Sequence, residues 1–124
     1  MKQSIQTSKA PGAIGPYSQA VVAGSFLFIS GQLPLHPETG EMPSGIEAQT
    51  RQCLANLKAI LEEAGASEAH VCEVSVFLKN MDDFAGMNGE YEKAFSAPYP
   101  SRAAVEVARL PKDALVEIKA TACL

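Results

Sequence analysis

The sequence has no apolar run that approaches the roughly 20 residues needed to span a bilayer, so we expect no association with a membrane. Its opening stretch, MKQSIQTSKAPG, also lacks the apolar block of a secretory signal, and we expect a cytoplasmic protein. Over 124 residues, a hydrophobic content of 47% is enough for one packed core, and the chain is too short for two. A single domain over residues 1–124 is therefore predicted.

Cysteine, histidine and positive charge are also scarce. Cys53, Cys72 and Cys123 are odd in number and share no Cys-x-x-Cys spacing, which argues against a disulfide framework or a zinc cluster and favours reduced, mostly buried thiols. His36 and His70 are not at ligand spacing, so we expect no bound metal. Ten lysines and arginines are spread along a chain of formal charge -4, and we expect no nucleic acid as a partner.

Two further signatures are missing. Gly12, Gly15, Gly24 and Gly31 are too widely spaced for a phosphate-binding loop and precede no convincing helix start, so we expect no nucleotide cofactor. No Ser/His/Asp or Cys/His arrangement is visible, which disfavours covalent acyl transfer. Any reaction would then use water, an arginine and a carboxylate.

The N-terminal half predicts a hairpin, a loop and a helix. The apolar residues from Ala20 to Leu33 are interrupted at Gly24 and Ser25, which is typical of two strands joined by a turn. Dense proline and glycine over residues 34–45 predict a surface loop that could border a site. From Ile46 the apolar residues recur at helical spacing until Gly65, which is a natural stop.

The C-terminal half predicts a strand, a helix and two more strands. The strand is Val71–Leu78, and alternation would place on one of its faces Cys72, Val74, Val76 and Leu78. Asp82 or Asp83 is expected to cap a second helix that runs until Pro98. The last two strands, 103–108 and 115–122, flank a turn at 110–113.

This order of elements predicts an α+β fold with two helices on one face of a sheet. Val71 and Phe77 would point away from Val74 and Val76, so the face without helices is also apolar. Such a surface is a liability in a monomer, and we expect a homo-oligomer. The periodicity alone does not choose between a trimer and a dimer.

Charged residues inside strand-like runs are candidates for chemistry, because burying an ion is costly unless it is paired or used. Arg102 lies beside small apolar residues, and its guanidinium could bind a carboxylate through two parallel hydrogen bonds. Alternatively, Arg102 is a surface arginine or pairs with Glu106. Glu117 could be a general base that holds a water, or only a solvent-facing partner of Lys119 or Lys112.

A hairpin of strands 103–108 and 115–122 would put Arg102 and Glu117 on neighbouring strands, in a register that the sequence does not fix. Four further polar or turn residues could line a cleft, although each has an ordinary structural role as the alternative: Tyr17, Ser30, Gly31 and Asn88.

The sequence resembles the RidA/YjgF family over nearly its whole length. The resemblance is carried by blocks that occur in the same order: GPYSQA at 15–20, ISGQ at 29–32, QCLANL at 52–57, Arg102, VEVARLPK at 105–112 and VEI at 116–118. It implies a chorismate-mutase-like α+β domain of the Bacillus type, with a mixed six-stranded sheet. It also implies a homotrimer around a central β-barrel, with clefts between subunits.

The same resemblance implies cofactor-independent hydrolysis of reactive 2-imino acids, such as 2-iminopropanoate and 2-iminobutanoate, to 2-keto acids and ammonia. Arg102 would clamp the substrate carboxylate, Glu117 would position or deprotonate water, and the cleft would be lined by Tyr17, Ser30, Gly31 and Asn88. Ala104 stands where members of the family often carry a cysteine, and only its backbone carbonyl would remain for contact. A changed pocket shape is expected there.

Two other functions compete with this hypothesis. The chain could be a regulatory or sensor protein that binds small carboxylates without turning over imino acids. It could also be an endoribonuclease, as some relatives are labelled, but an acidic chain does not favour a basic groove for RNA. We rank that hypothesis last.

Overall fold

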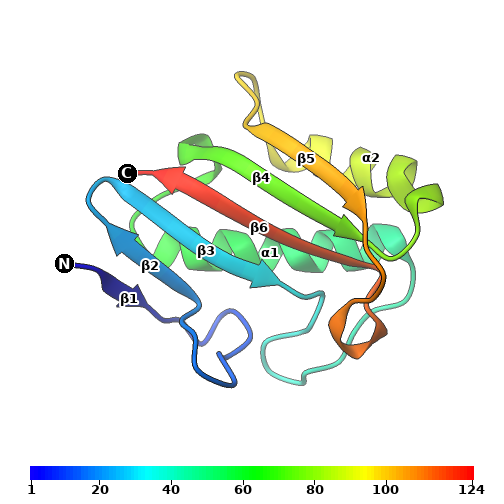
Figure 1. Cartoon of the computed structure of the whole chain (residues 1–124), viewed down its shortest axis with the longest axis horizontal. Helices are drawn as coiled ribbons and strands as arrows, with labels where there is room; N and C mark the ends of the chain where they lie inside the picture. The colour runs from blue at the N-terminus through cyan, green and yellow to red at the C-terminus, as the bar shows by residue number, and fades with distance from the viewer.

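Six strands form one mixed sheet, and two α-helices cover one of its faces (Figure 1). The computed structural model describes all residues, 1–124. The strands are β1 (Gln3–Ile5), β2 (Ala20–Ala23), β3 (Phe26–Gln32), β4 (Val71–Leu78), β5 (Ser101–Glu106) and β6 (Val116–Cys123). The α-helices are α1 (Ile46–Glu63) and α2 (Phe84–Ala94), and short 3₁₀ turns cover Glu68–His70, Met81–Asp83 and Pro111–Asp113. The predicted α+β class, sheet and helix layer are confirmed.

The strand order is β1-β2-β3-β6-β4-β5, which corrects one prediction. The last two strands do not form a hairpin, because β6 lies between β3 and β4 and is antiparallel to both. β5 is an edge strand parallel to β4. α2 makes the crossover between these two parallel strands, and such a connection needs a dozen or more residues rather than a tight turn. Arg102 and Glu117 therefore lie on strands separated by β4.

The core lies between the helices and the inner face of the sheet. α1 supplies an apolar stripe that includes Leu57, Ile60 and Leu61, all almost fully buried. The helix ends where predicted, because Gly65 adopts a φ of 77° that ordinary residues rarely take. The predicted hairpin of β2 and β3 is present, and Gly24 provides its left-handed turn residue with a φ of 59°.

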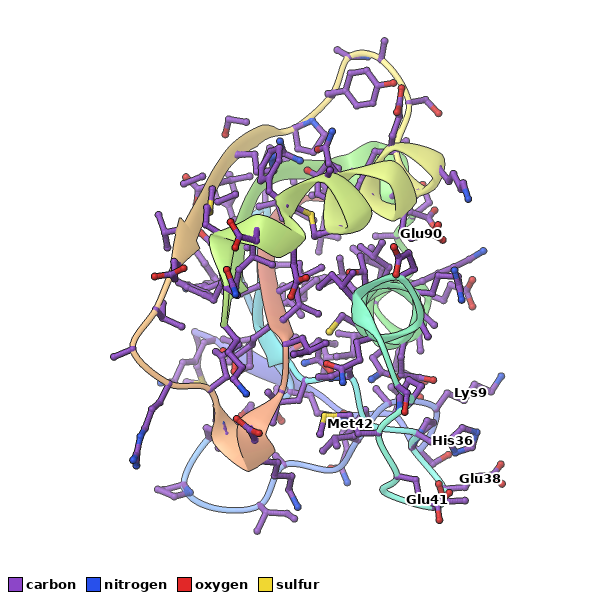
Figure 2. All side chains as sticks on the ribbon, turned by 90° about the vertical axis from the view of Figure 1, so that its right-hand side faces the viewer. Lys9, His36, Glu38, Glu41, Met42 and Glu90 are labelled. Carbon is purple, nitrogen blue, oxygen red and sulfur yellow. The ribbon has the colours of Figure 1, made fainter.

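An ion-pair network joins the two helices, centred on Glu90, which Figure 2 shows between α2 and α1. Glu90 of α2 accepts from Arg51 of α1 at 2.9 Å and from Lys93 at 3.0 Å. The Arg51 and Lys93 hydrogen bonds hold the pKa of the Glu90 carboxyl below its ordinary value. The loop over 34–45 has no regular element, as predicted, and it carries His36 (Figure 2). No group of three or more His, Cys, Asp or Glu side chains in the chain could hold a metal ion.

Strand β4 departs from the predicted alternation near its start. Val71 is buried with Val74, whereas Cys72 is exposed. The pairing register with β6 shifts between Val71 and Glu73, and this bulge reverses the side-chain pattern for one residue. Cys123 is also exposed, so the expectation of mostly buried thiols is wrong, and only Cys53 is buried.

The start of α2 is also different from the prediction. Neither Asp82 nor Asp83 caps the helix through its side chain; instead Asn80 Oδ1 accepts from the Asp82 N–H at 2.9 Å and begins a 3₁₀ turn that leads into α2. The helix ends at Ala94, before Pro98, because Phe95 has already turned to extended backbone.

The outer face of the sheet carries no helix (Figure 1). Phe28 remains 49% exposed there, and its strand neighbours on this face include Val21 and Thr121. Phe26 and Val105 are exposed to a similar degree. The apolar outer face is thus the surface for which a partner was predicted.

No helix combines the length and apolarity required to cross a membrane.

Candidate functional site

Arg102 lies on the edge strand β5 and reaches toward the helix layer. It pairs in register with Val74, whose side chain is buried on the inner face. Its Nη1 donates to Asn88 Oδ1 at 2.7 Å, and its guanidinium carbon lies 4.6 Å from the centre of the Tyr91 ring. The Phe84 ring lies 5.5 Å away. α2 therefore holds the guanidinium through one polar and two aromatic contacts.

A cavity of about 450 Å³ opens beside this arginine. It is lined by Asn88, Tyr91, Glu92, Tyr99, Pro100 and Arg102. Asn88 does not point simply to solvent, since it binds Arg102. The alternative pairing of Arg102 with Glu106 is wrong, because Glu106 accepts from the Met81 N–H at 2.9 Å and closes the turn before α2. The guanidinium thus has no carboxylate partner in the chain.

Glu117 lies near the start of β6 on the opposite, outer face. Alternation puts it with Lys119, as predicted, but it forms no ion pair with any lysine or arginine. The side chain is partly buried, and desolvation raises the pKa of its carboxyl. A carboxylate with a raised pKa and no cation beside it is suited to accept a proton.

Gly31 explains how Glu117 fits against the sheet. A β-carbon built on Gly31 would lie 2.9 Å from Glu117 Cδ and closer still to its Oε2, so any larger residue would collide with the carboxylate. Gly31 lies in an irregular stretch of β3, where the pairing with β6 shifts between Ile29 and Gln32. The glycine is needed because Glu117 occupies the space that a side chain would fill.

Ser30 is hydrogen-bonded to the segment that follows Tyr17. Ser30 Oγ donates to the Ser18 carbonyl at 2.6 Å, and Ser30 N–H donates to the Gln19 carbonyl at 2.9 Å. These bonds fasten the turn that carries Tyr17, whose side chain stays 54% exposed. Ser30 thus has the structural role that the sequence left open, and it positions a phenol that is free to contact a ligand.

The predicted residues therefore form two groups in one chain. Arg102 and Asn88 lie at the α2–β5 edge, on the inner side of the sheet. Glu117 is adjacent to Gly31 on the outer side, where β6 pairs it with Phe77. Ala104 lies two residues beyond Arg102 and packs, partly buried, against the core opposite Val76. One chain does not bring the arginine and the glutamate together.

Sequence reasoning missed the aromatic side chains that hold Arg102. The sequence predicts a helix through Phe84 and Tyr91 and assigns neither ring a role, although Phe84, Asn88 and Tyr91 are spaced by four and three residues. That spacing puts all three on one face of α2. The signal was present, but a strand partner for this face could be identified only from the β4–β5 pairing.

Known proteins match this chain nearly from end to end. Residues 7–124 match the family model described as Endoribonuclease L-PSP. A RutC family protein of Pyrococcus horikoshii is 58% identical over 98% of this chain and 98% of its own length. The 2-iminobutanoate/2-iminopropanoate deaminase of Escherichia coli strain K12 is 48% identical over 98% of each chain.

Solved structures agree with the sequence match. The crystal structure of Escherichia coli TdcF with bound serine has a TM-score of 0.95 at 46% identity and covers 98% of each chain. The sequence match over nearly the whole chain and the shared fold show that this chain is a member of the RidA/YjgF family.

Proposed function

We propose that the protein hydrolyses reactive 2-imino acids, such as 2-iminopropanoate and 2-iminobutanoate, to 2-keto acids and ammonia, without a cofactor. One observation carries the proposal. Arg102 is an arginine held in place by neutral contacts and free of any carboxylate, and Glu117 is an unpaired carboxylate with a raised pKa. These are the two groups that hydrolysis of an anionic imine requires.

The two groups have separate tasks in this reaction. Arg102 anchors the substrate carboxylate in a charge-assisted contact, which presents the imine carbon to water. Glu117 accepts a proton as the water oxygen bonds to that carbon and the C=N electron pair moves to nitrogen. Return of the proton to nitrogen allows the C–N bond to break, and ammonia leaves as the hydroxyl becomes the keto oxygen. The hydroxyl proton passes to the nitrogen as the C–N bond breaks, so both protons of the water end on the imine nitrogen and it leaves as NH3.

We further propose that each site forms between two copies of the chain in a homotrimer whose sheets surround a central barrel. Arg102 and Glu117 lie on opposite faces of one sheet, so a complete site requires a second copy. The exposed apolar outer face, which includes Phe28 and Val105, supports this assembly, because burying it removes an apolar surface from water. Tyr17, Ser30 and Gly31 would line the cleft beside Glu117, and Asn88 with the Ala104 carbonyl would line it beside Arg102.

Relatives support the chemistry and the ligand class. A protein named 2-iminobutanoate/2-iminopropanoate deaminase is 48% identical to this chain. TdcF, whose structure was solved with bound serine, is 46% identical. Serine carries a carboxylate and a nitrogen on the same carbon, as a 2-imino acid does. A free guanidinium edge is the group that would recognise that carboxylate.

The test generates 2-iminobutanoate in situ with an amino-acid oxidase and follows its decay with and without the protein. We expect faster decay that Arg102→Ala abolishes. Arg109→Ala is the matched control, since Arg109 is also exposed and has no hydrogen-bond or ion-pair partner. No acceleration by the wild-type protein, together with saturable binding of 2-ketobutanoate, would replace the deaminase with the carboxylate-sensor function.

A further inference from the structure

The contacts around Arg102 leave one defined part of its guanidinium open. Nη1 is engaged by Asn88 Oδ1, and the face of the group lies over Tyr91. Nε and Nη2 make no hydrogen bond in the chain. These two nitrogens form one edge of the planar fork and carry parallel N–H groups that match the two oxygens of a carboxylate. The direction of this edge decides where a substrate can bind.

Tyr91 is the most rigid of the residues that set this direction. Tyr91 is only 5% exposed, and its ring packs against the ring of Phe95, with the two ring centres 4.7 Å apart. The ring thus cannot swing away without disrupting the core of the helix layer. Phe84 lies farther from the guanidinium, at 5.5 Å, and is only partly buried.

The ring of Tyr91, rather than its hydroxyl, makes the contact with Arg102. The hydroxyl is buried and has no hydrogen-bond partner in the chain. Burial raises the pKa of this phenol, while the charge of Arg102 acts in the opposite direction. The phenol therefore stays neutral near pH 7, and what it offers the cation is the negative face of an aromatic ring.

We infer that Tyr91 is a positioning residue: its ring holds the Arg102 guanidinium so that the Nε–Nη2 edge faces the substrate carboxylate. This inference rests on the proposed function for the identity of the carboxylate. By this contact an exposed arginine on an edge strand, which would ordinarily sample many rotamers, is held in one orientation before a substrate arrives. Tyr91 also lines the cavity beside Arg102, and it acts on the reaction through the guanidinium that its ring holds.

The kinetic test compares Tyr91→Leu with Tyr91→Phe. Leucine removes the aromatic face, and we expect KM for 2-iminobutanoate to rise about tenfold with kcat changed by less than about twofold, because the carboxylate contact is made in both the ground and transition states. Tyr91→Phe keeps the ring and should restore KM to within about twofold of wild type. Phe95→Leu is the matched control, since leucine keeps an apolar neighbour against Tyr91 and so leaves the Tyr91 ring over Arg102.

A double-mutant cycle separates positioning from general destabilisation. In an Arg102→Lys background there is no fork to orient, so Tyr91→Leu should change KM by less than about twofold. A purely structural role predicts the same tenfold effect in both backgrounds. Equal KM changes in Tyr91→Leu and Phe95→Leu would likewise overturn the inference.

A spectroscopic measurement tests the contact without any turnover. The Arg102 Nε–H NMR signal, assigned by its loss in Arg102→Lys, should carry a ring-current shift and exchange slowly. Tyr91→Leu should abolish both features, and Phe95→Leu should keep them. If the wild-type protein does not hydrolyse imines, the proposed function fails while this signal still decides the role of Tyr91. An unchanged Nε–H signal in Tyr91→Leu would refute that role.

Discussion

Two inactive variants of this protein should regain activity when they share one oligomer. Arg102→Ala removes the carboxylate clamp, and Glu117→Gln removes the base while keeping its shape. Each pure variant lacks one half of every site, so we expect neither to accelerate imine decay. The two residues lie on opposite faces of the sheet, so a site between copies can take its arginine from one variant and its glutamate from the other.

The amount of activity regained depends on the symmetry. If the two variants carry different tags and are purified through both, every oligomer contains each kind of chain. In a cyclic trimer, two of one kind and one of the other leave one intact site among the three interfaces, so about a third of wild-type activity returns. In a two-fold dimer one of the two sites is intact, and about half returns. A site within one chain would regain none.

The assay is the decay of 2-iminobutanoate generated in situ, normalised to protein concentration. The control pairs Arg102→Ala with the double variant Arg102→Ala/Glu117→Gln, because that mixture contains no functional arginine at any interface. Restored activity in the first mixture and not in the control would support shared sites. Absence of restoration, with intact mixed oligomers in sedimentation, would refute the placement of Arg102 and Glu117 in one intersubunit site.

Four further outcomes are expected. Gly31→Ala should displace the Glu117 carboxylate and lower kcat by about 100-fold. Little stability should be lost, because the atoms that the new methyl group meets are at the end of the flexible Glu117 side chain. Gly12→Ala is the control: its β-carbon would meet nothing within 4 Å, so kcat should be unchanged. Because burial raises the pKa of Glu117, kcat/KM should fall as pH drops through that raised value. The same shift means that the folded chain binds the Glu117 proton more tightly than the unfolded chain, so the free energy of unfolding falls as pH rises from the unfolded-state pKa through the folded-state pKa of Glu117. Glu117→Gln should remove this pH dependence and raise Tm at pH 7. A Tm profile unchanged by this substitution would contradict the prediction. Phe28→Glu should shift the protein toward monomer in sedimentation velocity, because an oligomer would bury the new charge; an unaltered oligomer would show that this face is not the interface.

Much of the fold is predictable here because local patterns determine it. The strand over Val71–Leu78 and the helix that stops at Gly65 have clear periodicity and clear ends. The pairing of the last two strands, β5 and β6, was not predictable in this way. Adjacent strands usually pair, and only the long connection through α2, typical of parallel strands, indicates that β5 pairs with β4 instead.

The candidate site divides in the same manner. Residue types and the family resemblance identify Arg102 and Glu117, and the structure supplies their neighbours. The opposite orientation of the two side chains follows from register, which a sequence does not fix when the strand order is unknown. Cys72 illustrates the limit of alternation, because one bulge moves it from the expected inner face to the surface.

The central position of β6 has a consequence for synthesis on the ribosome. Residues 116–123 come after every other element in the chain, yet they join β3 to β4. Until they leave the exit tunnel, β3 and β4 each present an edge of unpaired backbone N–H and C=O groups, and the two parts of the sheet are not joined. Folding of the nascent chain is thus postponed until β6 has been synthesised, and a product truncated before β6 would be a substrate for chaperones or proteases rather than a partly folded domain.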